Sequence, residues 1–106
     1  MGKRQNASFV DYTRIRLQSQ QAILSLLQSW LPDGKVKGQE YIALNPTRED
    51  RHAGSFRINI RSGQWADFAT GDKGGDLIAL LAYLQNIRQH EAAIHLSRML
   101  GMEGIE

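Results

Sequence analysis

The sequence predicts a single domain of the α+β class, in which a small antiparallel sheet packs with helices from both ends of the chain. Apolar residues recur at helical spacing over residues 8–31 and again over 76–101. Residues 35–75 instead combine alternating apolar and polar positions with turn-forming residues. The chain has 106 residues, 42% of them hydrophobic, which suits one domain with one modest core. We therefore expect residues 1–106 to form one domain.

Composition narrows the class of protein. The absence of cysteine excludes disulfides and thiolate zinc sites, and fits a reducing compartment. The N-terminus carries basic residues without an apolar run behind them, and the apolar stretches are too short to span a bilayer. We expect a soluble, cytoplasmic protein without membrane contact. The net charge of +2 is compatible with nucleic-acid binding but does not demonstrate it.

The N-terminal helix is predicted over residues 8–31. Ser8, followed three residues later by Asp11, resembles a helix start, because both side chains can accept hydrogen bonds from free backbone N–H groups. Pro32 and Gly34 end the helix. Its apolar stripe is weak before residue 20, so the helix either begins late or carries a bend.

The middle of the chain predicts a meander of three or four antiparallel strands. Residues 35–40 form a polar connection or a short edge strand, and 41–44 form a strand. The clearest strand is SFRINI (55–60), where apolar and polar residues alternate. A tight turn at Ser62-Gly63 leads to QWADF (64–68) as its antiparallel partner.

The C-terminal part predicts a pair of helices within residues 76–101. Asp76 is suited to cap the first helix, which is apolar almost all round and ends near residues 86–88. The second helix runs from about Gln89 to Leu100, and Gly101 ends it. These helices must supply much of the buried apolar area, because a domain of this size buries a smaller share of its surface than a larger domain does.

Five short motifs occur in the same order as in a known family. They are YIALNPTR (41–48), GSFRI (54–58), WADFATG (65–71), GGDLI (74–78) and EAAIHL (91–96). Together they resemble the N-terminal zinc-ribbon domain of bacterial-type DNA primases, over roughly the last two thirds of the chain. More specifically, the chain resembles the leading segment of primase-helicase proteins of phages, plasmids and other mobile elements.

The resemblance ends at the metal ligands. Asn45, Arg48, Asp67 and Thr70 stand where the family has its zinc ligands. Arginine stays protonated and has no lone pair for a metal, so these residues predict no zinc and no other cofactor. We hypothesise that a charge-assisted hydrogen bond between Arg48 and Asp67, flanked by Asn45 and Thr70, replaces the ion.

The resemblance implies binding of single-stranded DNA and positioning of template for primer synthesis in replication. Cationic side chains beside aromatic rings suit this ligand, because phosphates take the charge and bases stack on the rings. The candidate residues are Lys35, Lys37, Arg51, Arg57, Asn59 and Arg61 for polar contacts and Tyr41 and Trp65 for stacking. The alternative is an ordinary solvated strand face with Trp65 in the core.

Catalysis by this chain alone is not predicted, because no nucleophile–base–acid series and no nucleotide-binding loop are present. We expect an accessory domain or subunit of a primase or primase-helicase. One alternative is a protein-interaction module that docks on a polymerase, helicase or primase through the apolar faces of its first and last helices. Another is a metal-dependent enzyme using Asp67 and Asp72, although acidic loop residues are usually just solvated.

Overall fold

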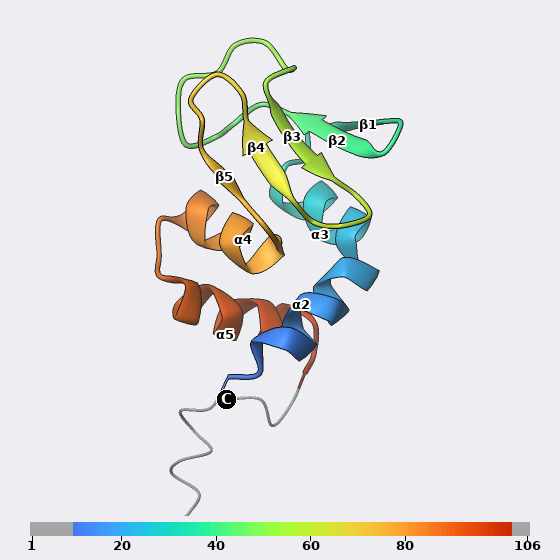
Figure 1. The fold of residues 1–106 in the computed structure, drawn as a ribbon, viewed down its shortest axis with the longest axis vertical. Coiled ribbons are helices and arrows are strands. Elements are labelled where there is room, and N and C mark those ends of the chain that lie inside the picture. The colour runs from blue at the N-terminus through green and yellow to red at the C-terminus, as the bar shows by residue number, and fades with distance from the viewer. Residues whose placement is uncertain (1–9, 103–106) are drawn as a thin grey trace, which may run out of the picture.

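The computed structural model describes residues 10–102, which form a five-stranded antiparallel sheet and four helices (Figure 1). The predicted α+β class is confirmed. The helices are α2 (Tyr12–Gln21), α3 (Ile23–Trp30), α4 (Leu77–Gln85) and α5 (Gln89–Met99). The strands are β1 (Lys35–Lys37), β2 (Glu40–Ala43), β3 (Phe56–Asn59), β4 (Trp65–Asp67) and β5 (Lys73–Gly74).

The strands follow one another in the sheet in chain order, from β1 at one edge to β5 at the other. Residues 35–40 therefore supply an edge strand, which is one of the two predicted alternatives. The sheet has five strands, whereas three or four were predicted. The strand that was not predicted is β5, which is only two residues long. A strand this short between turns has no alternation for sequence analysis to detect.

The N-terminal helical segment is divided at Ala22. Helix α2 begins at Tyr12, and the Asp11 carboxylate caps it by accepting a hydrogen bond from the Arg14 amide at 3.1 Å. The predicted start at Ser8 lies outside the described residues. Ala22 has non-helical dihedral angles, φ −108° and ψ 21°, so the break lies here and α3 starts after it, which agrees with the second of the two alternatives, a bend. Two hydrogen bonds from Gln20 to the carbonyls of Arg61 and Ser62 attach the β3–β4 turn to α2.

The C-terminal helices begin and end close to where the sequence predicts. Asp76 caps α4 by accepting a hydrogen bond from the Ala79 amide at 2.8 Å. Asn86, in the left-handed conformation at φ 55°, ends α4, and Gly101, at φ 69°, follows α5. Within residues 10–102, no helix is long and apolar enough to cross a membrane.

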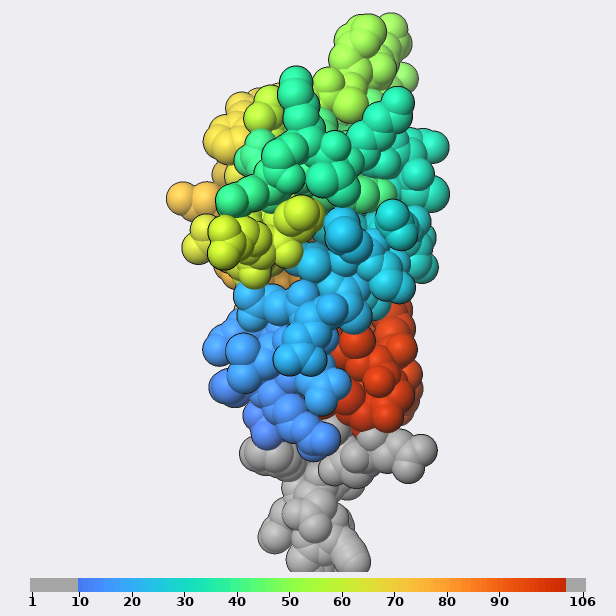
Figure 2. Space-filling view, turned by 90° about the vertical axis from the view of Figure 1, so that its right-hand side faces the viewer, coloured from blue at the N-terminus to red at the C-terminus, as the bar shows by residue number. Residues whose placement is uncertain are grey.

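The two faces of the sheet have different environments. Alternate residues of β2, β3 and β4, such as Tyr41, Phe56 and Trp65, are buried and belong to the core that the helices share. Figure 1 shows the sheet at one end of the molecule, with α3 and α4 next to it and α2 and α5 beyond, and Figure 2 shows α2 beside the end of α5. The intervening residues, including Arg57 and Ala66, are half-buried on the opposite side. We call that side the open face.

Candidate nucleic-acid interface

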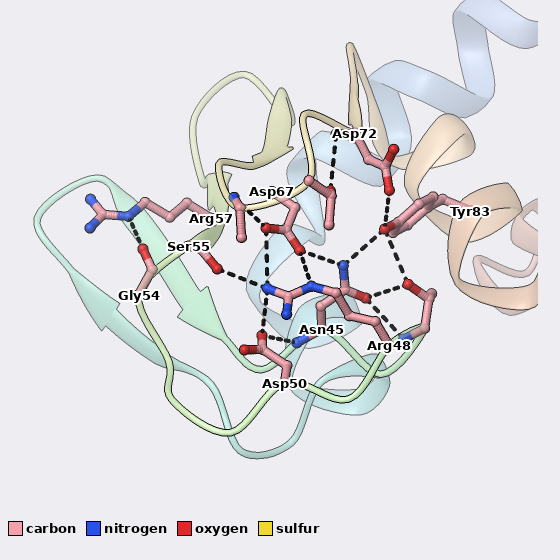
Figure 3. Close-up of polar contacts among 12 residues, drawn as sticks. Asn45, Arg48, Asp50, Gly54, Ser55, Arg57, Asp67, Asp72 and Tyr83 are labelled. Atoms are coloured by element: carbon pink, nitrogen blue, oxygen red, sulfur yellow. Dashed lines mark hydrogen bonds and ion pairs between the residues drawn. The ribbon is translucent and has the colours of Figure 1, made fainter.

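Three of the four residues predicted to stand in place of zinc ligands, Asn45, Arg48 and Asp67, lie close together and are linked by hydrogen bonds. Arg48 Nε donates to Asp67 Oδ2 at 2.8 Å and Arg48 Nη2 to Asp67 Oδ1 at 3.3 Å (Figure 3). Asn45 Nδ2 donates to the same Oδ2 atom, also at 2.8 Å. The predicted Arg48–Asp67 hydrogen bond is therefore confirmed. We call Asn45, Arg48 and Asp67, together with Tyr83, the Arg48 cluster.

The charge of Asp67 is compensated inside the protein. Its side chain is fully buried, whereas that of Arg48 is 27% exposed. The hydrogen bond from Arg48 holds the pKa of the Asp67 carboxyl well below its usual range, and bonds from Asn45 and the Ala69 amide act in the same direction against the effect of burial. A buried carboxylate without these donors would be strongly destabilising, so the cluster is a structural crosslink between the loop after β2 and the end of β4.

Tyr83 extends the cluster to helix α4. Its hydroxyl accepts a hydrogen bond from Asn45 Nδ2 at 2.9 Å and donates to Asp72 Oδ2 at 2.8 Å. Thr47 Oγ1 lies 2.7 Å from Asn45 Oδ1 and donates to it. The two loops that carry the cluster are thereby tied to each other and to the helical layer.

Thr70 does not take the predicted place beside the Arg48–Asp67 pair. Its hydroxyl accepts a hydrogen bond from the Asp72 amide at 3.2 Å, and its own amide donates to the Asp67 carbonyl at 3.2 Å. Thr70 is exposed and stabilises the 67–72 turn, because a short hydroxyl side chain in a turn bonds the backbone two residues on. The prediction that it flanks the pair was wrong.

Asp67 and Asp72, the candidate acidic pair, do not share a site for a cation. The Asp67 carboxylate faces Arg48, and the Asp72 carboxylate accepts from Tyr83. Within residues 10–102, no group of three or more metal-ligating side chains is gathered in one place. The arrangement therefore gives no support to metal-dependent chemistry at these two residues.

The two aromatic residues predicted to stack on bases are both in the core. Tyr41 is 1% exposed and Trp65 is 5% exposed. Two glycines allow this, because a Cβ on Gly34 would lie 2.2 Å from the Tyr41 ring and a Cβ on Gly74 would lie 2.6 Å from the Trp65 indole. The stacking role predicted for these rings was wrong, and the alternative that placed Trp65 in the core was right.

The open face carries a row of three cationic residues. Strand register aligns Lys35 with Ile42, Ile42 with Arg57, Arg57 with Ala66, and Ala66 with Lys73. Directly opposed residues of antiparallel strands point to the same face, so the three cations share this face. They stand on alternate strands, about 10 Å apart at the backbone, since neighbouring strands are about 4.8 Å apart. We call Lys35, Arg57 and Lys73 the cation row.

Arg57 lies at the centre of the row and is held in place by neighbours. Its Nε donates to the Gly54 carbonyl at 2.7 Å, and its Nη1 donates to Glu40 at 3.0 Å. The side chains of this ion pair remain 40% and 38% exposed, so it is open to solvent and to a ligand. Exposed pairs of this kind are weak, and an anionic ligand can compete with Glu40 for the guanidinium.

The other predicted polar contacts lie outside the row. Lys37 is exposed in β1, level with Glu40, and Arg61 is exposed in the β3–β4 turn. Arg51 lies in the loop before β3 and pairs with Glu49 at 3.8 Å. Asn59 serves the turn, because its Oδ1 accepts hydrogen bonds from the amides of Arg61 and Ser62. Of these four residues, Asn59 also lines the depression described next.

A shallow depression of about 600 Å³ lies on the open face across β2 to β5. Its lining includes Arg57, Ala66 and Lys73, and also Phe68, a ring that is 72% exposed. Neither Phe68 nor Lys73 was predicted from the sequence to contact a ligand. For Phe68 a signal was present in the predicted strand 64–68, because positions 65 and 68 of an extended strand point to opposite faces and one alternative placed Trp65 in the core.

Comparisons with known proteins add no assignment. No family model matches the chain, and no curated protein matches it significantly.

Proposed function

We propose that the open face of the sheet binds single-stranded DNA, with Lys35, Arg57 and Lys73 contacting successive parts of the phosphate backbone. The observation that carries this proposal is the cation row, which crosses the sheet on the face opposite the helices. Phosphate neutralisation by Lys and Arg supplies most of the affinity of such binding and requires no particular sequence.

The shape of this face favours a single strand over a duplex. Proteins that read B-DNA usually place a helix or a two-stranded ribbon in the major groove. Here the cations lie on a shallow surface beside an open depression, and the helices lie on the other side of the sheet. An extended, unpaired strand can follow such a surface and bring its bases close to it.

The resemblance to primase zinc ribbons gives this binding a biological setting. We propose that the domain positions template for primer synthesis by a cytoplasmic primase or primase-helicase of a mobile element. The residues that join nucleotides would lie in another domain or subunit. In this proposal the Arg48 cluster takes the place of the zinc ion, because Asn45, Arg48 and Asp67 hold together the two loops that carry the corresponding positions.

Fluorescence polarisation with labelled oligonucleotides tests the proposal. The chain should bind single strands more tightly than duplexes of the same length, and raising the salt concentration should weaken binding steeply. Affinity that does not change with salt, or equal binding of both forms, would contradict it.

The alternative, a docking module for a polymerase, helicase or primase, draws on the apolar surface of the helices. Much of that surface already packs in the core, including Ile15, Leu27 and Leu96. The large apolar side chains that stay exposed on the described helices are Tyr12, Leu17, Leu24 and Met99. A docking module predicts no salt-dependent affinity for oligonucleotides and loss of partner binding when Leu17 and Leu24 are replaced by polar residues.

A further inference from the structure

We infer that the depression on the open face seats one unpaired base of the bound strand, with Ala66 as the floor and the Phe68 ring as the stacking platform. This inference rests on the proposed function and adds a base site to the phosphate contacts. The stacking role predicted for Tyr41 and Trp65, which are buried, is assigned instead to Phe68, which a ligand can reach.

The surroundings of Ala66 leave room for a flat ring. Across the strands, Ala66 stands between Arg57 and Lys73 in the cation row. The residues two positions before and after Ala66 are Gln64 and Phe68, which flank β4 and both line the depression. The longer side chains therefore surround a methyl group. The volume of about 600 Å³ lies within the range of ligand sites, about 300–1,000 Å³.

Phe68 offers an exposed aromatic ring on a fixed backbone. The residue is 72% exposed, the largest fraction among the large apolar residues of 10–102. The backbone beneath it is fixed, because the Phe68 amide donates to the Ser55 carbonyl at 2.8 Å and the preceding Asp67 side chain is held by Arg48 at 2.8 Å. A residue whose backbone is already fixed loses little backbone entropy when a base covers its side chain. The Arg48 cluster thus helps to fix the backbone that carries the ring.

Charge identifies the occupant as a nucleotide. Two of the residues around the depression, Arg57 and Lys73, are cationic, and its one carboxylate, Glu40, is already paired with Arg57. A neutral apolar side chain of a partner protein would supply no counter-charge for Lys73 and could not compete with Glu40 for Arg57. A nucleotide supplies a π-face for Phe68 and phosphates for the cations on either side. Because every base has a π-face, the seat selects unpaired bases without selecting a sequence.

DNA strands with and without bases distinguish base binding in the depression from the phosphate contacts. We would titrate the full chain with labelled oligothymidine of about ten nucleotides and with a fully abasic strand of equal length. Both strands carry the same phosphates. The unmodified chain should bind oligothymidine on the order of tenfold more tightly than the abasic strand. In Phe68→Leu this ratio should fall toward one, through loss of affinity for oligothymidine alone.

A second variant and a control complete the test. Ala66→Leu fills the floor while keeping Phe68, and should abolish the preference for bases in the same way. Tyr12→Leu removes an exposed ring from α2 and should leave both affinities unchanged. If both strands bind with salt dependence and Phe68→Leu leaves their ratio intact, the base seat is refuted and the phosphate contacts stand. If neither strand binds, the proposed function fails, and the seat fails with it.

Discussion

Arg48 and Arg57 each pair with a carboxylate, yet they lie in very different surroundings. The partner of Arg48, Asp67, is fully buried, whereas the partner of Arg57, Glu40, is 38% exposed. Figure 3 shows the Arg48 side chain pointing into the cluster and the Arg57 side chain pointing away from it. The buried pair compensates a charge that water cannot reach, so it stabilises the fold. The exposed pair contributes little to stability and leaves a cation for a ligand.

Removal of Asp67 should have the largest effect. Asp67→Ala leaves the Arg48 guanidinium and the Asn45 amide without their shared acceptor, and should lower the free energy of unfolding by about 3 kcal/mol. Urea denaturation measures this change. Glu49→Ala is the matched control, because its carboxylate is 85% exposed and pairs with Arg51 at 3.8 Å, so the stability should barely change. Equal stability of the two variants would contradict a structural role for the cluster.

Removal of two cations from the row should give the largest change in DNA affinity. Arg57→Ala combined with Lys73→Ala should weaken binding of single strands on the order of tenfold or more, because two phosphate contacts are lost. The slope of log affinity against log salt should become shallower by about 1.4, at roughly 0.7 for each contact with a single strand. Polarisation titrations at several salt concentrations measure both.

A control with the same loss of charge makes this result specific. Arg14→Ala combined with Arg16→Ala removes two cations from α2, in the helical layer. Its affinity should stay close to that of the unmodified chain. If both double variants lose affinity equally, the binding reflects net charge and the cation row has no special role.

Acid should lower the stability that the Arg48 cluster gives to the fold. Because the pKa of Asp67 is lowered in the folded protein, its contribution to stability is complete above its unfolded pKa of about 3.9 and is lost as the pH falls below that value. Stability should therefore decrease between about pH 5 and pH 2. In Asp67→Asn this decrease should be shallower, since the titrating group is gone. Thermal unfolding followed across this pH range tests the prediction, and identical pH profiles would oppose it.

Neutralisation of Glu40 should give the smallest effect, and one of opposite sign. Glu40→Gln removes the carboxylate that competes with phosphate for Arg57, so affinity for single strands should rise about two- to fourfold. Stability should change little, because the ion pair is exposed. Weaker binding in this variant would show that Glu40 helps to hold Arg57 in its binding position.

Local signals in the sequence were sufficient for helix ends such as Asp76 and Gly101, whereas the Arg48–Asp67 contact was predicted from the resemblance and Tyr83 was not predicted. Asp76 and Gly101 act through hydrogen bonds or dihedral angles of nearby residues, which a short motif specifies. The contact between Arg48 and Asp67 was expected because the resemblance assigns both residues to positions of ligands to one ion, which must lie close together.

Burial of single side chains depends on contacts between distant residues and could not be predicted in the same way. Tyr41 and Trp65 are buried because Gly34 and Gly74, on neighbouring segments, leave space for their rings. The cation row also depends on register, since Lys73 joins it through a strand too short to recognise in the sequence.

The most direct test compares Arg48→Gln and Arg57→Gln in two measurements, urea denaturation and polarisation with single-stranded oligonucleotides. The structure predicts that Arg48→Gln lowers the free energy of unfolding. At a temperature where this variant is folded, its affinity for an abasic strand should equal that of the unmodified chain. It predicts that Arg57→Gln keeps its stability and loses affinity for the same strand. The reverse pattern, or loss of both properties in both variants, would contradict the division between a structural cluster and a binding face.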